Sequence, residues 1–540
     1  MTTFVANVGG DTTFAAGRLD NQGGSSRLNT KGDVKLNAVN VGYQSNSIGD
    51  ANNYYKESAS QDIGSQLRGK DDIIITGNNI SGTAVNINSD NGTVGIIADS
   101  TVDFNEGRNK QNLSTAVKTT DKGFLSKTIT QSRFDSQSDN AITSNIEGDQ
   151  VLVQAGQDIN FTGTNASSDR GTSLTAGRDV NLLAAENTAS ETKFSQTKKS
   201  GLFGTDGGIG FTIGKQQTDD SNTKTALTHT GSNIGAIDGN VLIDAGGTYQ
   251  QTGSNLVAGM GADSDKDIQD ANRGNTVIRA KDINIDSVKN IYTNQSAQKF
   301  KQSGLTVSVS NSLVDNIKSI DRLIDAGGDT DSTRMKGMAG IAATLKTKAL
   351  AAEANSAADA LLSGNLKGVG NTRIQATIGS SKSQSNSSSV TEENQGSNIN
   401  TNNLALIATG AGSDSNIDIN GSNLNVSNDA LFQADNDFNV NAVAQNSNTR
   451  SNNKSSSTAI GGYASFGQNT SGGITASASR AKGFANSNSV TYANSHINVG
   501  GNTTFDIGND VNIKPRFLQR HLINLIISNL CCKPYINRLR

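Results

Sequence analysis

Acidic side chains form the cluster with the clearest metal-binding chemistry. The segment GADSDKDIQD contains Asp263, Asp265, Asp267 and Asp270. Clustered carboxylates are the ligands that Ca²⁺ prefers. An EF-hand loop starting at Asp263 would need Gly at its sixth position and Glu at its twelfth, but Ile268 and Gly274 stand there. We therefore interpret the segment as a solvated acidic loop and predict no metal site.

A glycine-rich string, GGIGFTIG at Gly207–Gly214, suggests two kinds of ligand site. A calcium-binding nonapeptide repeat requires Asp at its sixth place, where Thr212 stands. A dinucleotide fingerprint requires Gly-x-Gly-x-x-Gly at a strand-to-helix turn. Counted from Gly208, the third glycine falls one place late, at Gly214. We predict no cofactor.

Groups for nucleophilic catalysis are scarce. Cys531 and Cys532 both follow Pro515, so the body of the chain has no thiol for a disulfide or a zinc site. The histidines are His229, His496 and His521, and the first two each precede an expected strand in a similar context, which indicates a structural role. The acids sit at turn positions and give no recognisable glycosidase pair. We predict no catalytic residue and no enzyme activity.

The composition indicates a thin, repetitive β structure. The 540 residues carry a net charge of −3, include 58 Gly and no Trp, and are 33% hydrophobic. Near-neutral charge argues against a nucleic-acid partner, which would require a basic surface. Both prolines, Pro515 and Pro534, lie near the carboxy terminus. Because proline cannot donate a ladder hydrogen bond, its absence elsewhere fits a chain that is mostly sheet.

One short motif recurs along the chain and predicts strands at a fixed interval. AGQDINF at Ala155–Phe161 is echoed by AGRDVNL at Ala176–Leu182, 21 residues later. Related strings stand at Gly32–Leu36, Lys281–Ile285, Asn436–Val440 and Asn509–Ile513. Apolar residues at alternate positions after a turn residue predict half-buried strands.

The interval predicts a parallel β-helix (β-solenoid). Three strand-and-turn steps of about seven residues make one coil of about 20 residues, and stacked coils bury a common core. The predicted inward residues are Ile159, Phe161, Val180, Leu182, Ile283 and Ile285. Asparagines at equivalent places are expected to stack as amide ladders. With coils about 4.8 Å apart, we expect about 15–20 coils and a rod of about 70–100 Å.

Longer segments interrupt the period. Ser/Thr/Lys-rich arms around a Gly-rich turn predict β-hairpin excursions at 107–150, at 188–230 and again from Ala442. Another segment is different, because Leu313, Val314, Ile317, Ile320, Leu323 and Ile324 have helical spacing. With a second Ala/Leu-rich run over 334–362, it predicts a helical hairpin insertion.

These features resemble the hemagglutinin-repeat region of two-partner-secreted exoproteins, a group that includes filamentous hemagglutinins and contact-dependent growth inhibition proteins. The resemblance rests on the strings at Gly231–Ala258, Ser173–Asn187, Lys198–Gly204 and Gly207–Gln216, and it covers nearly all of Met1–Lys514. It implies a mostly β, right-handed parallel β-helix with β-hairpin excursions and one helical insertion.

The resemblance also implies a function. We expect a structural rod of a large secreted bacterial surface protein that serves adhesion or contact-dependent toxin delivery to neighbouring bacteria. Its implied partners are an outer-membrane secretion protein and a target-cell receptor, with outer-membrane contact. A polysaccharide-degrading β-helix enzyme and an autotransporter passenger are the alternatives. Zero Trp and eight Tyr disfavour the enzyme, which would need aromatic platforms for sugars.

Several expected parts of such exoproteins are not visible. We find no signal peptide, no secretion-recognition domain, no Val-Glu-Asn-Asn boundary motif and no toxin module, so we interpret the chain as an internal fragment. The basic tail differs from the body, and we interpret it as a frameshifted end, with a genuine cap or anchor as the alternative.

The expected organisation follows from these segments. It comprises solenoid coils at 1–106, a hairpin at 107–150, coils at 151–187, a hairpin at 188–230, coils at 231–311, a helical insertion at 312–364, coils with a further hairpin at 365–514, and the basic tail at 515–540.

Overall fold

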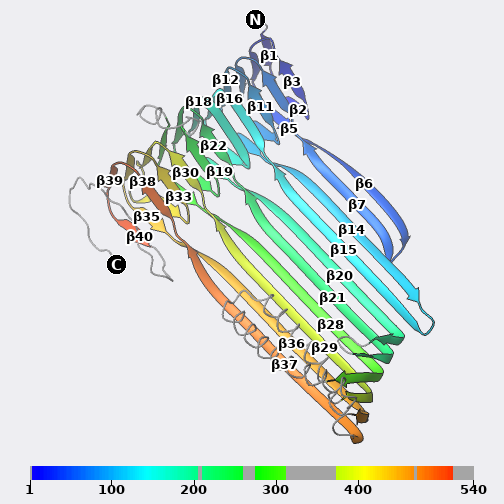
Figure 1. The fold of residues 1–540 in the computed structure, drawn as a ribbon. Coiled ribbons are helices and arrows are strands. Elements are labelled where there is room, and N and C mark those ends of the chain that lie inside the picture. Colours follow the sequence, from blue (N-terminus) through cyan, green and yellow to red (C-terminus); the bar gives the residue numbers. More distant parts are fainter. Residues whose placement is uncertain (1–2, 205–208, 260–273, 312–371, 467–470, 515–540) are drawn as a thin grey trace, which may run out of the picture.

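The computed structural model describes residues 3–204, 209–259, 274–311, 372–466 and 471–514. These residues form a parallel β-solenoid from which a broad antiparallel sheet projects (Figure 1). The predicted β-solenoid class is therefore confirmed. The predicted helical insertion, the acidic loop of Asp263–Asp270 and the basic tail lie outside the described residues.

Three parallel sheets form the faces of the solenoid, and the chain visits them in the order one, three, two. Face one comprises β1 (Phe4–Val8), β4 (Ser26–Thr30), β9 (Ile73–Gly77), β12 (Thr93–Ala98), β23 (Asn240–Ala245), β26 (Asn275–Ala280), β31 (Asn403–Ala408), β34 (Ala430–Ala434) and β39 (Thr503–Ile507). Face two comprises β3 (Arg18–Asn21), β8 (Gln66–Gly69), β11 (Asn86–Ser89), β22 (Asn233–Ala236), β25 (Asn255–Ala258), β30 (Asn398–Thr401), β33 (Asn423–Val426) and β38 (His496–Val499).

Two longer strands, β16 (Ser144–Ala155) and β18 (Thr164–Ala176), run through faces two and one without a break. Face three comprises β2 (Thr12–Ala15), β5 (Val34–Asn37), β10 (Ile80–Thr83), β13 (Val102–Asn105), β17 (Ile159–Thr162), β19 (Val180–Leu183), β24 (Thr248–Thr252), β27 (Asp282–Asp286), β32 (Ile417–Asn420), β35 (Phe438–Asn441) and β40 (Val511–Lys514). A short 3-10 helix, η2 (Gly412–Asp414), precedes β32.

The core is a continuous column of apolar side chains inside the three faces. All six residues predicted to point inward, among them Phe161 and Ile283, are fully buried. The echoed motifs stack directly, with Ile159 beside Val180 and Phe161 beside Leu182. Tyr249 and Gln251 add a polar pair to this column, because the buried tyrosine hydroxyl donates to the Gln251 Oε1 at 3.0 Å.

The solenoid is shorter than the sequence estimate. Face three holds eleven strands among the described residues, which at about 4.8 Å per coil corresponds to a rod of about 50 Å. The estimate of 15–20 coils was wrong because a large part of the chain leaves the coils for the projecting sheet.

The projecting sheet is antiparallel and ten-stranded in the described residues. Its five hairpins are β6 (Val39–Asp50) with β7 (Asn53–Ile63), β14 (Gly107–Lys122) with β15 (Ser126–Ile142), β20 (Ala185–Gly204) with β21 (Ile209–Thr230), β28 (Val288–Asn311) with β29 (Thr372–Gln395), and β36 (Val443–Phe466) with β37 (Ser471–Ala493). Neighbouring hairpins also pair, as β7–β14, β15–β20, β21–β28 and β29–β36. The hairpins therefore form one continuous sheet.

Two of these hairpins lie where the sequence analysis expected only coils. The β6–β7 hairpin falls within 1–106, and β28 occupies the end of the 231–311 segment. The long, polar strands of the projecting sheet lack the Gly-Asp turn signal and a regular apolar alternation, so their composition resembled that of ordinary loops.

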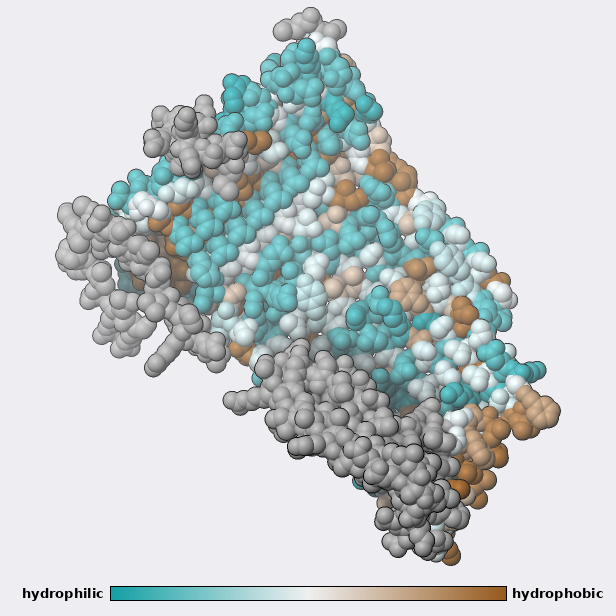
Figure 2. Space-filling model, in the orientation of Figure 1, coloured by the Kyte–Doolittle hydropathy of each residue, from teal (hydrophilic) through white to brown (hydrophobic). Residues whose placement is uncertain are grey.

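The visible surface of the solenoid is mostly hydrophilic, while brown apolar residues gather at the far end of the projecting sheet (Figure 2). No helix within the described segments is long and apolar enough to span a bilayer.

Candidate functional site

The corner between faces three and two is where every hairpin leaves the solenoid. Hairpins follow β5, β13, β19, β27 and β35, which are alternate strands of face three. The intervening coils close the same corner with a single residue of positive φ: Ala16, Ala84, Gly163, Gly253 and Gly421, with φ between 48° and 59°. The corner thus alternates between a tight left-handed turn and a long hairpin.

The alternation has a geometric basis. Coils stack about 4.8 Å apart, and strands within a sheet have the same spacing. One hairpin contributes two strands, which is the thickness of two coils. A hairpin on every second coil therefore fills the projecting sheet without gaps and without overlap.

A column of hydroxyl groups runs along this corner, and all its members except the half-buried Ser495 are buried. Its members are Ser65, Ser144, Thr164, Ser232, Ser254, Ser397, Ser422 and Ser495. All except Thr164 accept a backbone N–H from the preceding coil, and all eight donate to a backbone carbonyl. Ser397, for example, accepts from the Ser254 N–H at 3.2 Å and donates to the Asp286 carbonyl at 2.6 Å. The column satisfies backbone groups that the corner would otherwise bury unpaired.

An amide ladder lies one residue further along. Asn165, Asn233, Asn255, Asn398 and Asn423 each donate from Nδ2 to the Oδ1 of the asparagine one coil earlier, at 2.7–3.0 Å. His496 continues the column, with its Nδ1 3.1 Å from the Asn423 Oδ1. The expected stacking of asparagines is confirmed here.

A third ladder explains the aspartate of the recurring motif. At the turn before face three, an Asp or Asn carboxyl or amide oxygen accepts the backbone N–H of the equivalent residue in the next coil. Asp11 accepts from Asp33 at 3.0 Å, Asp158 from Asp179 at 3.2 Å, and Asp437 from Asp510 at 3.1 Å. The Oδ1 of a short Asp or Asn side chain reaches the backbone N–H of the next coil, which explains why these residues recur at this position of the motif.

Two aspartates near face three have opposite electrostatic environments. The Arg178 guanidinium donates to Asp158, with Nε 2.6 Å from Oδ1, and lowers the pKa of that carboxyl. Burial acts in the opposite direction on Asp418 in face three and raises its pKa, with the nearby carboxylates of Asp282, Asp286 and Asp437 adding to the effect. Asp158 is therefore stabilised as a carboxylate, whereas Asp418 is not.

The groups singled out for chemistry are dispersed within the described residues. Residues 209–214 of the Gly-rich string form the start of β21, where they pair antiparallel with residues 304–309 of β28. His229 closes the same strand and contacts the Asn290 side chain, with Nδ1 3.0 Å from Oδ1. No three metal-binding side chains converge in the part of the chain that the structure describes. His521, Cys531 and Cys532 lie outside it.

The hydroxyl column was missed by the sequence analysis, although a signal for it exists. The tripeptide Gly-Ser-Asn stands at Gly231–Asn233, Gly253–Asn255, Gly396–Asn398 and Gly421–Asn423. Each copy places its serine in the hydroxyl column and its asparagine in the amide ladder. A tripeptide count would have found the corner before the strands were known.

The fold and its corner ladders define a class of protein: a repetitive β-solenoid that carries a projecting hairpin sheet. The hemagglutinin-repeat family model matches residues 125–269 and 378–519. The chain belongs to this family of hemagglutinin-repeat regions found in two-partner-secreted exoproteins.

Several curated relatives support this membership. The chain is 32% identical over 516 residues to the protein named tRNA nuclease CdiA-2 of Burkholderia pseudomallei strain 1026b, covering 92% of the chain and 16% of that relative. It is 30% identical over 394 residues to tRNA nuclease CdiA of Escherichia coli strain STEC_O31, covering 72% of the chain and 12% of the relative.

A third relative, named 16S rRNA endonuclease CdiA, comes from Enterobacter cloacae and is 30% identical over 351 residues, which are 63% of the chain and 10% of the relative. The chain thus spans only a small part of these relatives. No solved structure matches the chain.

Proposed function

We propose that this region is a structural rod of a large secreted bacterial surface protein that serves cell–cell adhesion or contact-dependent toxin delivery. The observation that carries the proposal is the continuous stack of coils, together with the matching of this stretch to a small part of much longer relatives. The rod would hold a binding site or an effector at a distance from the producing cell.

The region itself is proposed to be non-catalytic. The nuclease names belong to the whole relatives, whereas the described residues present ladders of structural hydrogen bonds and a polar surface. A test is to incubate the purified chain with pectin, alginate, glycosaminoglycan and tRNA. Turnover of any of them would overturn the non-catalytic part of the proposal.

The implied partners follow from the same proposal. An outer-membrane secretion protein would export the full-length parent, and a receptor on the target cell would bind it at the surface. Both are partners of the parent protein, and the solenoid would supply its reach.

The delivery role is tested in a bacterium that produces the full-length parent. The coding sequence for residues 3–514 is deleted in frame, and surface display, target-cell attachment and target-cell growth are measured separately. We expect normal synthesis with lost attachment or lost growth inhibition. Unchanged attachment and inhibition would contradict the proposal.

A matched control replaces the deleted region with an equal number of coils from another hemagglutinin-repeat protein. If a rod is all that is needed, this exchange restores activity. If the exchange fails while display is normal, the region contributes a specific surface as well as reach.

A further inference from the structure

One face of the projecting sheet carries a patch of positive charge near its outer edge. Two neighbouring cross-strand rows on β28, β29, β36 and β37 hold the patch, defined as Lys299, Lys454 and Lys482 in one row and Lys301, Lys382 and Arg480 in the next. Gln384 and Ser456 fill the remaining two of the eight positions. The rows contain no carboxylate on these four strands.

The six side chains point to the same side of the sheet and are exposed. Paired residues of an antiparallel sheet share a face, and residues two apart along a strand share it as well. All six are exposed to solvent. The row between them, which faces the other side, consists of Phe300, Ser383, Ser455 and Ala481 and carries no charge.

The arrangement of the patch is costly for folding. Lys301 lies directly opposite Lys382, and Lys454 lies directly opposite Lys482. Like charges in directly opposed cross-strand positions destabilise a sheet. Four strands and two rows span about 14 Å by 7 Å, comparable with the screening length of about 10 Å at 0.1 M salt, so the six charges repel one another.

Elsewhere on the same sheet, close to the solenoid, cations have acidic partners. Lys289 lies 3.0 Å from Glu392, and Arg108 lies 2.7 Å from Asp139. The six patch residues make no ion pair with any other described residue. The nearest acid in these rows is Asp219 of β21, directly opposite Lys299, and its carboxylate accepts from the Gln196 and Gln217 side chains. The six cations on β28, β29, β36 and β37 therefore lack an acidic partner.

The groups around the patch indicate the chemistry of a partner. Asn386, Asn452 and Phe484 form the adjacent row on the same face, and Phe484 is 84% exposed. Amides that donate and accept hydrogen bonds, together with one flat apolar ring, suit hydroxyl-rich sugar rings. A single aromatic side chain is a poor match for single-stranded nucleic acid, which is bound by successive stacking platforms.

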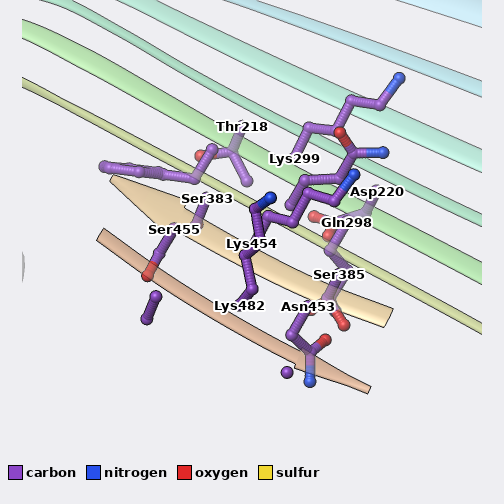
Figure 3. A pocket seen from close by; sticks show the side chains of 14 residues that line it. Thr218, Asp220, Gln298, Lys299, Ser383, Ser385, Asn453, Lys454, Ser455 and Lys482 are labelled. Atoms are coloured by element: carbon purple, nitrogen blue, oxygen red, sulfur yellow. The ribbon is translucent and has the colours of Figure 1, made fainter. Parts of the chain in front are cut away.

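The surrounding strands give the patch a defined shape. On the face of the patch, a shallow concavity of about 590 Å³ adjoins it, lined by residues that include Asn386, Asn452 and Phe484. A second concavity of about 320 Å³ lies on the other side of the same strands, where the rows of Gln298 and Phe300 line it (Figure 3).

We propose that this basic patch binds an anionic polysaccharide at a cell surface, with its sulfate, phosphate or carboxylate groups neutralising the opposed lysine pairs. The inference deepens the proposed function by naming a partner class for the projecting sheet. It rests on the proposed function only in assuming that the polysaccharide is encountered at a cell surface.

The test uses the purified full chain and measures binding to dextran sulfate, with uncharged dextran as the matched ligand. The patch variant is K382Q/K454Q/K482Q. The control variant is K31Q/K70Q/K224Q, which removes three exposed lysines outside the patch and changes the net charge equally. We expect dextran sulfate but not dextran to bind, a loss of about tenfold for the patch variant, and less than about twofold for the control.

The unfolding midpoint supplies a second readout. Because the patch variant loses repulsion between opposed lysines, we expect it to unfold at an equal or higher temperature than the parent while binding less. A loss of binding that accompanies unfolding would instead reflect structure, and it would overturn the proposal.

Other outcomes also overturn it. Equal losses in the patch and control variants would show a general charge effect. Tighter binding of single-stranded DNA, or of phosphatidylglycerol vesicles, through the same lysines would assign the patch to a different partner. Since no cell is involved, failure here leaves the delivery test untouched, and failure of delivery leaves this binding measurement untouched.

Discussion

At the residue scale, the tight corners of the solenoid place both alanine and glycine in the left-handed backbone conformation, which only glycine adopts without steric cost. Ala84 has a φ of 51° where equivalent coils use Gly163, Gly253 and Gly421. An L-residue in this left-handed region costs about 1–2 kcal/mol, whereas glycine adopts it without steric cost. We expect Ala84→Gly to stabilise the chain by about 0.5–1 kcal/mol, after its larger loss of backbone entropy, as measured by guanidinium unfolding.

The reverse substitution is the control. Gly163→Ala introduces a Cβ only 2.9 Å from the Ala185 Cβ at a φ of 56°, so we expect a loss of about 1–2 kcal/mol. If both substitutions moved the midpoint in the same direction, the left-handed strain would not be the controlling factor.

A pH-dependent prediction concerns Asp418. Its pKa is raised above the ordinary value of 3.8 because of burial and the neighbouring carboxylates. A raised folded-state pKa means that the group favours folding below pH 3.8 and that this contribution is lost as the pH rises through the folded-state pKa. We therefore expect Asp418→Asn to be more stable than the parent at pH 7, by about 0.5 kcal/mol after solvent screening, with the advantage vanishing in acid.

Asp158, in the turn before face three, provides the opposite case. Its pKa is lowered by the hydrogen bond from Arg178, so its carboxylate stabilises the fold above the unfolded-state pKa and ceases to do so in acid. Asp158→Asn should cost about 1 kcal/mol at pH 7 and progressively less as the pH falls below the ordinary value of 3.8. Thermal unfolding of both variants between pH 3 and 8 checks the two signs, and parallel profiles would refute the assignment.

The residue-scale features differ in how readily the sequence reveals them. Inward residues such as Ile159 and Val180 were predictable because alternation along a strand reports burial directly. The repulsion around Asp418 was not, since Asp286 is on the preceding coil and 132 sequence positions away. Spatial neighbours separated by a long hairpin leave no local pattern.

At the element scale, a hairpin and a tight turn are interchangeable ways of closing one corner. The edge hairpin β36–β37 joins Asn441 of face three to Ser495 of the hydroxyl column. The preceding coil joins Asn420 to Ser422 through Gly421 alone. The hairpin and the single glycine therefore both connect a strand of face three to a serine of the hydroxyl column.

The corresponding prediction is an excision. Replacing residues 442–494 by one glycine reproduces the closure seen at Gly421, and it removes only an edge of the projecting sheet. We expect the solenoid to fold with nearly unchanged thermal stability and the remaining hairpins to keep their resistance to limited proteolysis, because their pairings are intact.

An internal excision is the matched comparison. Replacing 184–231 by one glycine removes β20 and β21 and leaves β15 and β28 as two new unpaired edges. We expect faster proteolysis of both neighbouring hairpins and a tendency to associate through the exposed edges. Equal behaviour of the two excisions would mean that the hairpins do not support one another.

The elements themselves were predicted unevenly. Coil strands carry turn residues and alternating apolar residues, so their type and interval were readable. The hairpin strands are polar on both sides for much of their length, as in Ser380–Ser389 of β29. A single-layer sheet with two solvated faces does not require apolar residues at alternate positions. The β6–β7 and β28–β29 hairpins therefore lack the alternation that predicts a strand, and the sequence did not reveal them.

At the scale of the whole molecule, the solenoid and the projecting sheet are held to a common spacing. Two coils rise by about 9.6 Å, which is also the width of one two-stranded hairpin. The corner ladders fix the first distance, and the cross-strand hydrogen bonds fix the second. The repeating unit of the molecule is therefore two coils and one hairpin, rather than the single coil of 21 residues that the echoed motifs suggest.

The common spacing predicts different results from two insertions. A second copy of residues 156–176, placed after Ala176, adds one coil without a hairpin. The coil should stack, since it carries its own ladder residues Asp158, Thr164 and Asn165. It would, however, set the β14–β15 and β20–β21 hairpins three coils apart, at about 14 Å instead of about 10 Å, and so open the sheet between β15 and β20.

A tandem copy of residues 65–143 adds two coils and one hairpin, and we expect it to keep the sheet closed. The measurement is hydrogen exchange at the β15 amides between Ser126 and Asp139, which pair with β20 in the parent. Amides that bond across this boundary should lose protection after the 21-residue insertion and keep it after the longer one. Retained protection in both proteins would show that the hairpins adjust independently of the coils, and the two-coil unit would then have no physical basis.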